Sequence, residues 1–172
     1  MRRGEVLGLT WRNVDLDNAR LTVNQQILSV EYEAKVADVK TAHSRRTIDL
    51  DPRTVAMLKA WRRHQLEQKM ITGRRNDEGF VFARNDGGPI HPDSFSQSWE
   101  RLVRTSAFRR IRLHDLRHTH ATILLKAGVP VKVVSERLGH SNPAFTITVY
   151  QHVLPGMQAD AAAAFSAAVF DV

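Results

Sequence analysis

The 172-residue sequence contains no cysteine, so it can form neither disulfides nor thiolate metal sites. No apolar run comes near the roughly 18 residues of a membrane-spanning helix, and nothing resembles the apolar core of a signal peptide. No pair of carboxylates suggests an acid–base dyad. We therefore expect a soluble, intracellular protein of one domain, long enough to bury a substantial core.

Positive charge is in excess. The chain has 25 lysines and arginines against 18 aspartates and glutamates, a formal net charge of +7. Cationic side chains that neutralise phosphates release condensed counterions, which favours binding to a polyanion. Nucleic acid is the first partner that the composition indicates.

The first half is predicted to form a small antiparallel sheet followed by a long helix. Residues 20–30 and 44–50 are rich in Val, Ile and Thr and are bounded by polar residues, as strands are. Lys40 falls in the polar connection between them. Asp51 is the expected N-cap of the helix, with Pro52 at its first position.

The second half is predicted to be mainly helical after a short buried strand at 80–83. The expected helices begin at Pro92, span 113–128 and 130–139, lead to Tyr150, and fill the alanine-rich tail 156–172. In the helix over 113–128, the residues expected to face inward are Leu116, Ile123, Leu124 and Ala127. The fold class is therefore mainly α with a small antiparallel β-sheet (α+β).

His114 and Arg117 lie three residues apart, so on a helix they share one face. An imidazole beside a guanidinium suits an anionic oxygen, although a solvated polar face would look the same. His114 and His118 also have the i, i+4 spacing of helical zinc sites, but no glutamate base lies between them. His120, near the apolar face, is expected to be a core histidine.

Three further candidates each have an ordinary alternative. His140 follows a glycine at a helix end, and Tyr150 follows ten residues later, where a tyrosine usually serves packing. Lys40 in a polar turn would ordinarily be a solvated surface charge. Arg2 and Glu5 would ordinarily be a helical i, i+3 ion pair worth a few tenths of a kcal/mol.

Together, these residues form a set suited to phosphoryl transfer without a metal. An in-line attack on a phosphodiester builds charge on the non-bridging oxygens, which Arg and His donors stabilise electrostatically. A tyrosine hydroxyl would attack, and a lysine could protonate the departing oxygen. The set consists of Arg2, Lys40, His114, Arg117, His140 and Tyr150.

The order and wording of five motifs resemble the tyrosine recombinase, or phage integrase, family. They are MRRGEVLGLTW with the first arginine at Arg2, VKTAHSRRTIDL with the hairpin lysine at Lys40, LHDLRHTHAT with the His-x-x-Arg box, LGHS with His140, and TVYQHVLP with the nucleophile at Tyr150. The resemblance runs from Arg2 to about Pro155.

The resemblance implies a mostly helical catalytic domain that acts on double-stranded DNA. Tyr150 would attack a scissile phosphate to give a 3′-phosphotyrosine and a free 5′-hydroxyl, and the 5′-hydroxyl of a second strand would reverse the step. The residues around the phosphate would be Arg2, His114, Arg117 and His140, with Lys40 as general acid. Neither metal nor ATP is required, because the bond energy is kept in the covalent intermediate, so no cofactor is expected.

The resemblance also implies an organisation. Residues 1–155 would be a catalytic domain lacking its first helices and the N-terminal DNA-clamping domain, which should weaken specific DNA binding. The tail 156–172 would dock on a neighbour in a tetramer on DNA, in the cytoplasm of a bacterial host and on its nucleoid, away from membranes. A catalytically silent DNA-binding remnant of a truncated prophage integrase is the main alternative, favoured if Arg2 is displaced; a topoisomerase-like relaxing activity is another.

Overall fold

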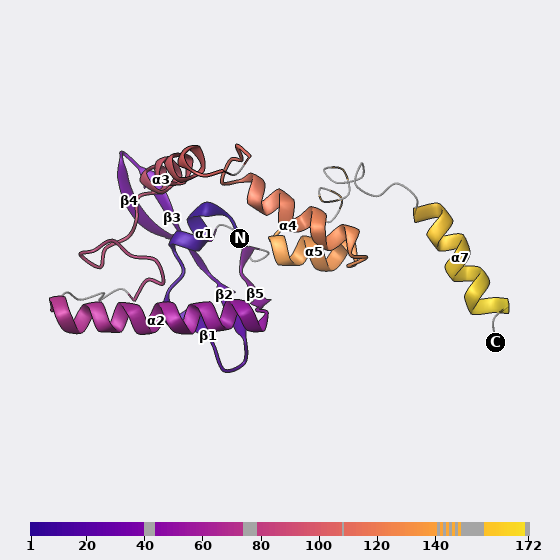
Figure 1. The fold of residues 1–172 in the computed structure, drawn as a ribbon, viewed down its shortest axis with the longest axis horizontal. Helices are drawn as coiled ribbons and strands as arrows, with labels where there is room; N and C mark the ends of the chain where they lie inside the picture. The colour runs from indigo at the N-terminus through magenta and orange to yellow at the C-terminus, as the bar shows by residue number, and fades with distance from the viewer. Residues whose placement is uncertain are drawn as a thin grey trace.

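The computed structural model describes residues 1–39, 44–73, 79–107, 109–140 and 157–170, together with residues 142, 144, 146 and 148. Two small sheets lie between the long helix α2 (Pro52–Thr72) and helix α3 (Pro92–Thr105), with α4 (Asp115–Lys126) and α5 (Val131–Leu138) to one side (Figure 1). In chain order the elements are α1 (Arg3–Leu7), η1 (Trp11–Asn13), β1 (Val14–Asp15), β2 (Arg20–Val23), β3 (Gln25–Val30), β4 (Glu33–Asp38), β5 (Arg46–Asp49), α2 (Pro52–Thr72), α3 (Pro92–Thr105), α4 (Asp115–Lys126), α5 (Val131–Leu138) and α7 (Met157–Phe170). The predicted α+β class is confirmed.

The strand predicted at 20–30 is divided between two antiparallel sheets, so the prediction of a single sheet is wrong. β1, β2 and β5 form one sheet, and β3 pairs only with β4 among the described strands. The pattern did not indicate β4, because its residues are largely exposed. The hairpin turn at Glu31 and Tyr32 has φ values of 52° and 62° without the Asn or Gly that usually signals such a turn.

Helix α2 begins where the sequence predicts. The Asp51 carboxylate accepts a hydrogen bond from the Thr54 backbone N–H at 3.0 Å, and Pro52 opens the helix. At the other end, Gly73 adopts a φ of 64°, the left-handed conformation that closes helices. Local capping signals therefore determine both ends of this helix.

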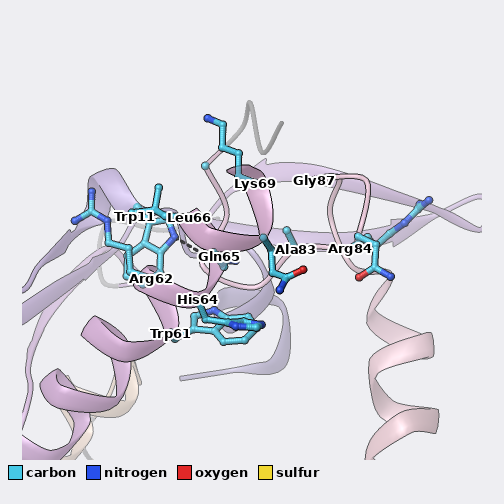
Figure 2. A pocket seen from close by; sticks show the side chains of 13 residues that line it. Trp11, Trp61, Arg62, His64, Gln65, Leu66, Lys69, Ala83, Arg84 and Gly87 are labelled. Atoms are coloured by element: carbon cyan, nitrogen blue, oxygen red, sulfur yellow. Dashed lines mark hydrogen bonds between the residues drawn. The ribbon is translucent and has the colours of Figure 1, made fainter. Parts of the chain in front are cut away.

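Two tryptophans fasten α2 to the neighbouring segments. The Trp61 indole N–H donates to the Val81 carbonyl at 2.6 Å, and the Trp11 indole N–H donates to Gln65 Oε1 at 2.8 Å. Both rings line a pocket of about 460 Å³ (Figure 2). Phe82, which is partly buried, stacks with Trp61, which is 37% exposed. Because these contacts engage the indoles internally, we interpret them as packing that holds the helix in place.

The strand predicted at 80–83 is not a continuous strand. Phe80 bridges to Thr10 and Ala83 bridges to Pro89, each as an isolated antiparallel pair. Phe80 is nevertheless buried, as its apolar surroundings in the sequence suggested.

Helix α1 lies flat against β3. Leu7 packs with Ile27 and Phe80 in a buried cluster. At Gly4, a Cβ would lie only 2.6 Å from the Ile27 carbonyl oxygen, so no larger residue fits there without a shift. This close packing fixes the position of Arg2, which immediately precedes the helix.

Helices α4 and α5 pack against each other through a different face of α4 from the one predicted. The buried apolar residues of this pair are Ala121, Leu125, Val134 and Leu138. On α4 the buried stripe is Arg117, Ala121 and Leu125, one residue every fourth position. Of the residues predicted to face inward, Leu124 is partly buried against this cluster, but Leu116, Ile123 and Ala127 are exposed, because α5 lies against the other face. An arginine therefore occupies an inward position.

The C-terminal helix α7 exposes its described side chains, including Phe165, which is 67% exposed, and Val169. Within the described ranges, no helix has the length and apolar character required to cross a membrane.

Candidate active site

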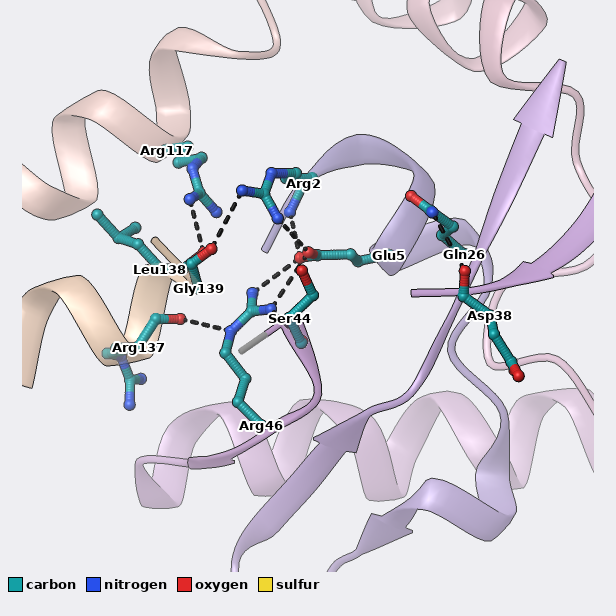
Figure 3. Close-up of polar contacts among 10 residues, drawn as sticks. All are labelled: Arg2, Glu5, Gln26, Asp38, Ser44, Arg46, Arg117, Arg137, Leu138 and Gly139. Carbon is teal, nitrogen blue, oxygen red and sulfur yellow. Dashed lines mark hydrogen bonds and ion pairs between the residues drawn. The ribbon is translucent and has the colours of Figure 1, made fainter. Parts of the chain in front are cut away.

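The C-terminal end of α5 binds three arginines from three different parts of the chain (Figure 3). The pairs are Arg46 Nε with the Arg137 carbonyl at 3.0 Å, Arg117 Nη2 with the Leu138 carbonyl at 2.6 Å, and Arg2 Nη2 with the Gly139 carbonyl at 3.1 Å. The last carbonyls of a helix lack intrahelical partners and carry the negative end of its dipole. This helix end therefore gathers three cations at one place.

Glu5 is the buried carboxylate that separates two of these arginines, and its side chain is only 1% exposed. It accepts hydrogen bonds from the Arg2 backbone N–H at 2.6 Å and from Arg2 Nη1 at 3.1 Å. Arg46 donates to both carboxylate oxygens, at 3.2 and 2.8 Å. Burial raises the pKa of Glu5, but the hydrogen bonds from Arg46 and Arg2 outweigh burial and lower that pKa below its usual value.

Arg2 is held at three points, through its backbone N–H, Nη1 and Nη2. Its side chain is nevertheless 44% exposed, so the guanidinium is accessible to a ligand. Arg2 is therefore not displaced, and a displaced Arg2 was the observation that would have favoured a silent remnant. The i, i+3 pair with Glu5 exists as well, within this larger network.

Arg117 is 8% exposed and lies on the inward stripe of α4. His114 is at the N-terminal end of the same helix, where its ring lies edge to face with that of His118, with 4.9 Å between the ring centroids. Burial, then His118 and Arg117, lower the pKa of His114 below its usual value. Arg117 is thus a buried cation, whereas His114, three residues earlier, is an exposed imidazole whose lowered pKa favours its neutral form.

His140 directly follows the helix end that binds the arginines. Its Nδ1 is 2.7 Å from the hydroxyl of Thr146, a fully buried residue. Burial, followed by the charges of Arg117 and Arg2, lowers the pKa of His140 to about 4. His140 is therefore neutral at pH 7 and carries a single ring N–H.

The remaining two predicted residues, Lys40 and Tyr150, lie outside the described residues. The structure therefore does not test the roles predicted for these two residues.

The prediction that His120 is a core histidine is wrong. The side chain is exposed, and its Nε2 accepts a hydrogen bond from Arg137 Nε at 3.2 Å. His118 and His114 share the predicted i, i+4 spacing, but in the described part of the chain no group of three or more His, Asp or Glu is arranged to hold a metal ion.

Sequence reasoning missed Arg46 and Thr146. Arg46 could have been found from the alternation of β5, because residues two apart share a face of a strand and Ile48 is buried. Nothing local distinguishes it from its exposed neighbour Arg45 in other respects. Thr146 has no such signal, since its role depends on a partner six residues away.

Comparison with known proteins finds one matching family. The Phage integrase family model matches residues 1–156. A "Tyrosine recombinase XerC-like" protein of Caldanaerobacter subterraneus subsp. tengcongensis is 33% identical over 94% of the chain, and the "ICEBs1 integrase" of Bacillus subtilis is 30% identical over 94%. The chain spans 44% of the length of each of these two relatives.

Solved structures show the same fold. The Tn1549 transposon integrase in complex with transposon right end DNA superposes with a TM-score of 0.75 and 25% identity, over 98% of this chain and 55% of that one. The XerA recombinase superposes with a TM-score of 0.68 at 20% identity, over 92% of this chain and 51% of that one. The chain belongs to the phage integrase family, the tyrosine recombinases.

Proposed function

We propose that this chain cleaves and rejoins DNA strands through a covalent phosphotyrosine, as a step of site-specific recombination. The observation that carries the proposal is the helix end at which Arg2 and Arg117 meet beside a neutral His140. Preorganised donors of this kind stabilise the charge that develops on the non-bridging oxygens of a phosphodiester during in-line displacement.

The residues take the following parts in the proposed reaction. The Tyr150 hydroxyl loses its proton to solvent and forms a bond from Oη to phosphorus, while the bond from phosphorus to the 5′ oxygen breaks. Lys40 gives a proton to that departing oxygen, which leaves as a 5′-hydroxyl. The DNA remains attached as a 3′-phosphotyrosine, and attack by a 5′-hydroxyl reverses the step. The phosphate is surrounded by Arg2, His114, Arg117 and His140.

The test is capture of the covalent intermediate. A pool of duplexes with randomised sequence and a nick near the centre lets the short 5′-hydroxyl fragment diffuse away after cleavage, so the adduct accumulates. We expect an SDS-resistant protein–DNA adduct that Tyr150→Phe abolishes. Tyr32→Phe is the matched control, because Tyr32 is the other tyrosine of the sequence and is exposed on the β3–β4 turn.

Sequencing the captured DNA identifies the target. An adduct that survives Tyr150→Phe would contradict the proposed nucleophile. If no adduct forms on any member of the pool while salt-sensitive DNA binding is measured by fluorescence anisotropy, the chain is a DNA-binding remnant and the proposal fails.

The proposal includes double-stranded DNA as the partner and assembly of several copies on it, which would place the protein on the nucleoid of its bacterial host. The net charge of +7 supports DNA binding, and the related Tn1549 integrase is described in complex with DNA. The exposed apolar side chains of α7, such as Phe165, support docking of this helix on a neighbouring copy. Deletion of residues 157–172 should abolish DNA-dependent association measured by sedimentation; unchanged association would refute the role of α7.

A further inference from the structure

We propose that Arg46 is a positioning residue of the cleavage reaction, which holds Arg2 and the end of α5 in the arrangement that receives the phosphate. The inference rests on the proposed function and assigns a role to a residue outside the set expected to touch DNA. It is carried by the contacts of one buried guanidinium.

The Arg46 guanidinium joins helices α1 and α5 to the segment just before its own strand. It donates to both oxygens of Glu5 on α1, to the Arg137 carbonyl at the end of α5, and to the Ser44 carbonyl just before β5. The distances lie between 2.8 and 3.2 Å. A planar guanidinium can make these bonds together because its N–H groups diverge in a fixed fork.

Arg46 is not placed to bind the phosphate itself. Its side chain is 7% exposed and its charge faces the Glu5 carboxylate. Arg2, by contrast, is 44% exposed and shares the same carboxylate. Because one carboxylate serves both arginines, the position of Glu5, and with it that of Arg2, depends on the bonds from Arg46.

Packing leaves the guanidinium little freedom. A Cβ on Gly139 would lie 2.6 Å from Arg46 Nη1 and 2.8 Å from its Cζ. The guanidinium thus lies directly against the backbone whose carbonyl binds Arg2 and which leads into His140. A change at Arg46 should therefore displace Arg2 and His140 together.

The experiment compares single-turnover cleavage by Arg46→Lys and by the unaltered protein, on the duplex identified by adduct capture. Lysine keeps the charge that ionised Glu5 needs, but its compact ammonium cannot make the forked contacts. We expect cleavage to slow by about 100-fold, the order of loss that a displacement of about 1 Å causes at a reacting centre. The DNA dissociation constant should change less than about threefold, since no DNA contact is removed. Arg45→Lys, at the exposed neighbouring position, is the matched control and should cleave normally.

A second substrate separates positioning of the phosphate-binding groups from a general structural effect. A methylphosphonate at the scissile position has a methyl group in place of one charged oxygen, so it depends less on Arg2 for charge stabilisation. The loss of cleavage rate caused by Arg46→Lys should be at least about tenfold smaller on this substrate, because tenfold in rate corresponds to about 1.4 kcal/mol, the size of one interaction with the missing oxygen. An equal deficit on both substrates, or none on ordinary DNA, overturns the inference.

If Arg46→Lys fails to fold by circular dichroism, Gly139→Ala displaces the same guanidinium without removing it and should show the same substrate dependence. Failure of the unaltered protein to form any Tyr150 adduct would overturn the proposed function and this inference together. Normal adduct formation by both the unaltered protein and Arg46→Lys would overturn the inference alone.

Discussion

Replacement of Gly139 by alanine should destabilise the protein through two separable effects. The backbone at this position has a φ of 74°, in the left-handed region. There an alanine costs about 1–2 kcal/mol relative to glycine, because its Cβ approaches the neighbouring carbonyl oxygen. The new Cβ would also lie 2.6 Å from Arg46 Nη1, closer than two such atoms come without movement of one of them.

The size of the second effect follows from a matched glycine. Gly128 has a φ of 78° and no atom within 4 Å of a Cβ built on it. Gly128→Ala should therefore show the backbone cost alone, about 1–2 kcal/mol. Gly139→Ala adds the cost of forcing atoms into a packed site, typically about 1–3 kcal/mol, which gives a total of roughly 2–5 kcal/mol.

Urea denaturation followed by circular dichroism measures both variants, provided the slopes of the transitions stay equal. In thermal unfolding, each kcal/mol corresponds to a shift of about 2–4 °C for a chain of this size. The reasoning would be refuted if Gly139→Ala were no less stable than Gly128→Ala, because the Arg46 guanidinium could not then be packed against residue 139.

Two further predictions concern His140. Thr146→Val keeps the shape of the side chain but removes the hydroxyl that bonds to His140 Nδ1, so the free energy of unfolding in urea should fall by about 1–3 kcal/mol and cleavage should slow. Thr146→Ser should largely restore both, and equal behaviour of the valine and serine variants would argue against the bond. The pKa of His140 is lowered from 6.5 to about 4 in the folded protein, so the unfolded chain binds more protons between these pH values and the free energy of unfolding should fall as the pH is lowered through this window. His140→Gln should flatten that dependence in urea titrations at pH 4.5 and 7, and an unchanged slope would contradict the assignment.

Elements with local signals were predicted well from the sequence. Asp51 and Pro52 define the start of α2, because an N-cap and a helix-opening proline act on their own backbone. The β3–β4 hairpin was missed, because Tyr32 adopts a positive φ in its turn and the turn contains no Asn or Gly to indicate it. Its stability depends on the pairing of β3 with β4 and on the contact of β3 with α1, and the local sequence indicates neither.

The same distinction holds in the site. His114, Arg117 and His140 were predicted from motif wording, and Arg117 donates to the Leu138 carbonyl two residues before His140. That Arg117 is buried could not be seen, because the stripe it occupies on α4 depends on which face α5 covers. Arg46 acquires its importance from Glu5, 41 residues earlier in the chain, and only the folded protein brings the two together.

The cluster at the end of α5 has a consequence for the energetics of the free protein. Among the described residues Glu5 is the only buried carboxylate, while Arg2, Arg46 and Arg117 converge on the same helix end. Mutual repulsion of these cations is a cost that the fold bears in the absence of an anion. A phosphate bound beside Arg2 and Arg117 would offset that cost and shift the folding equilibrium towards the native state, by an amount that grows with its concentration. The substrate would then serve as a folding ligand, and the excess positive charge of the cluster would contribute to its affinity for the phosphate.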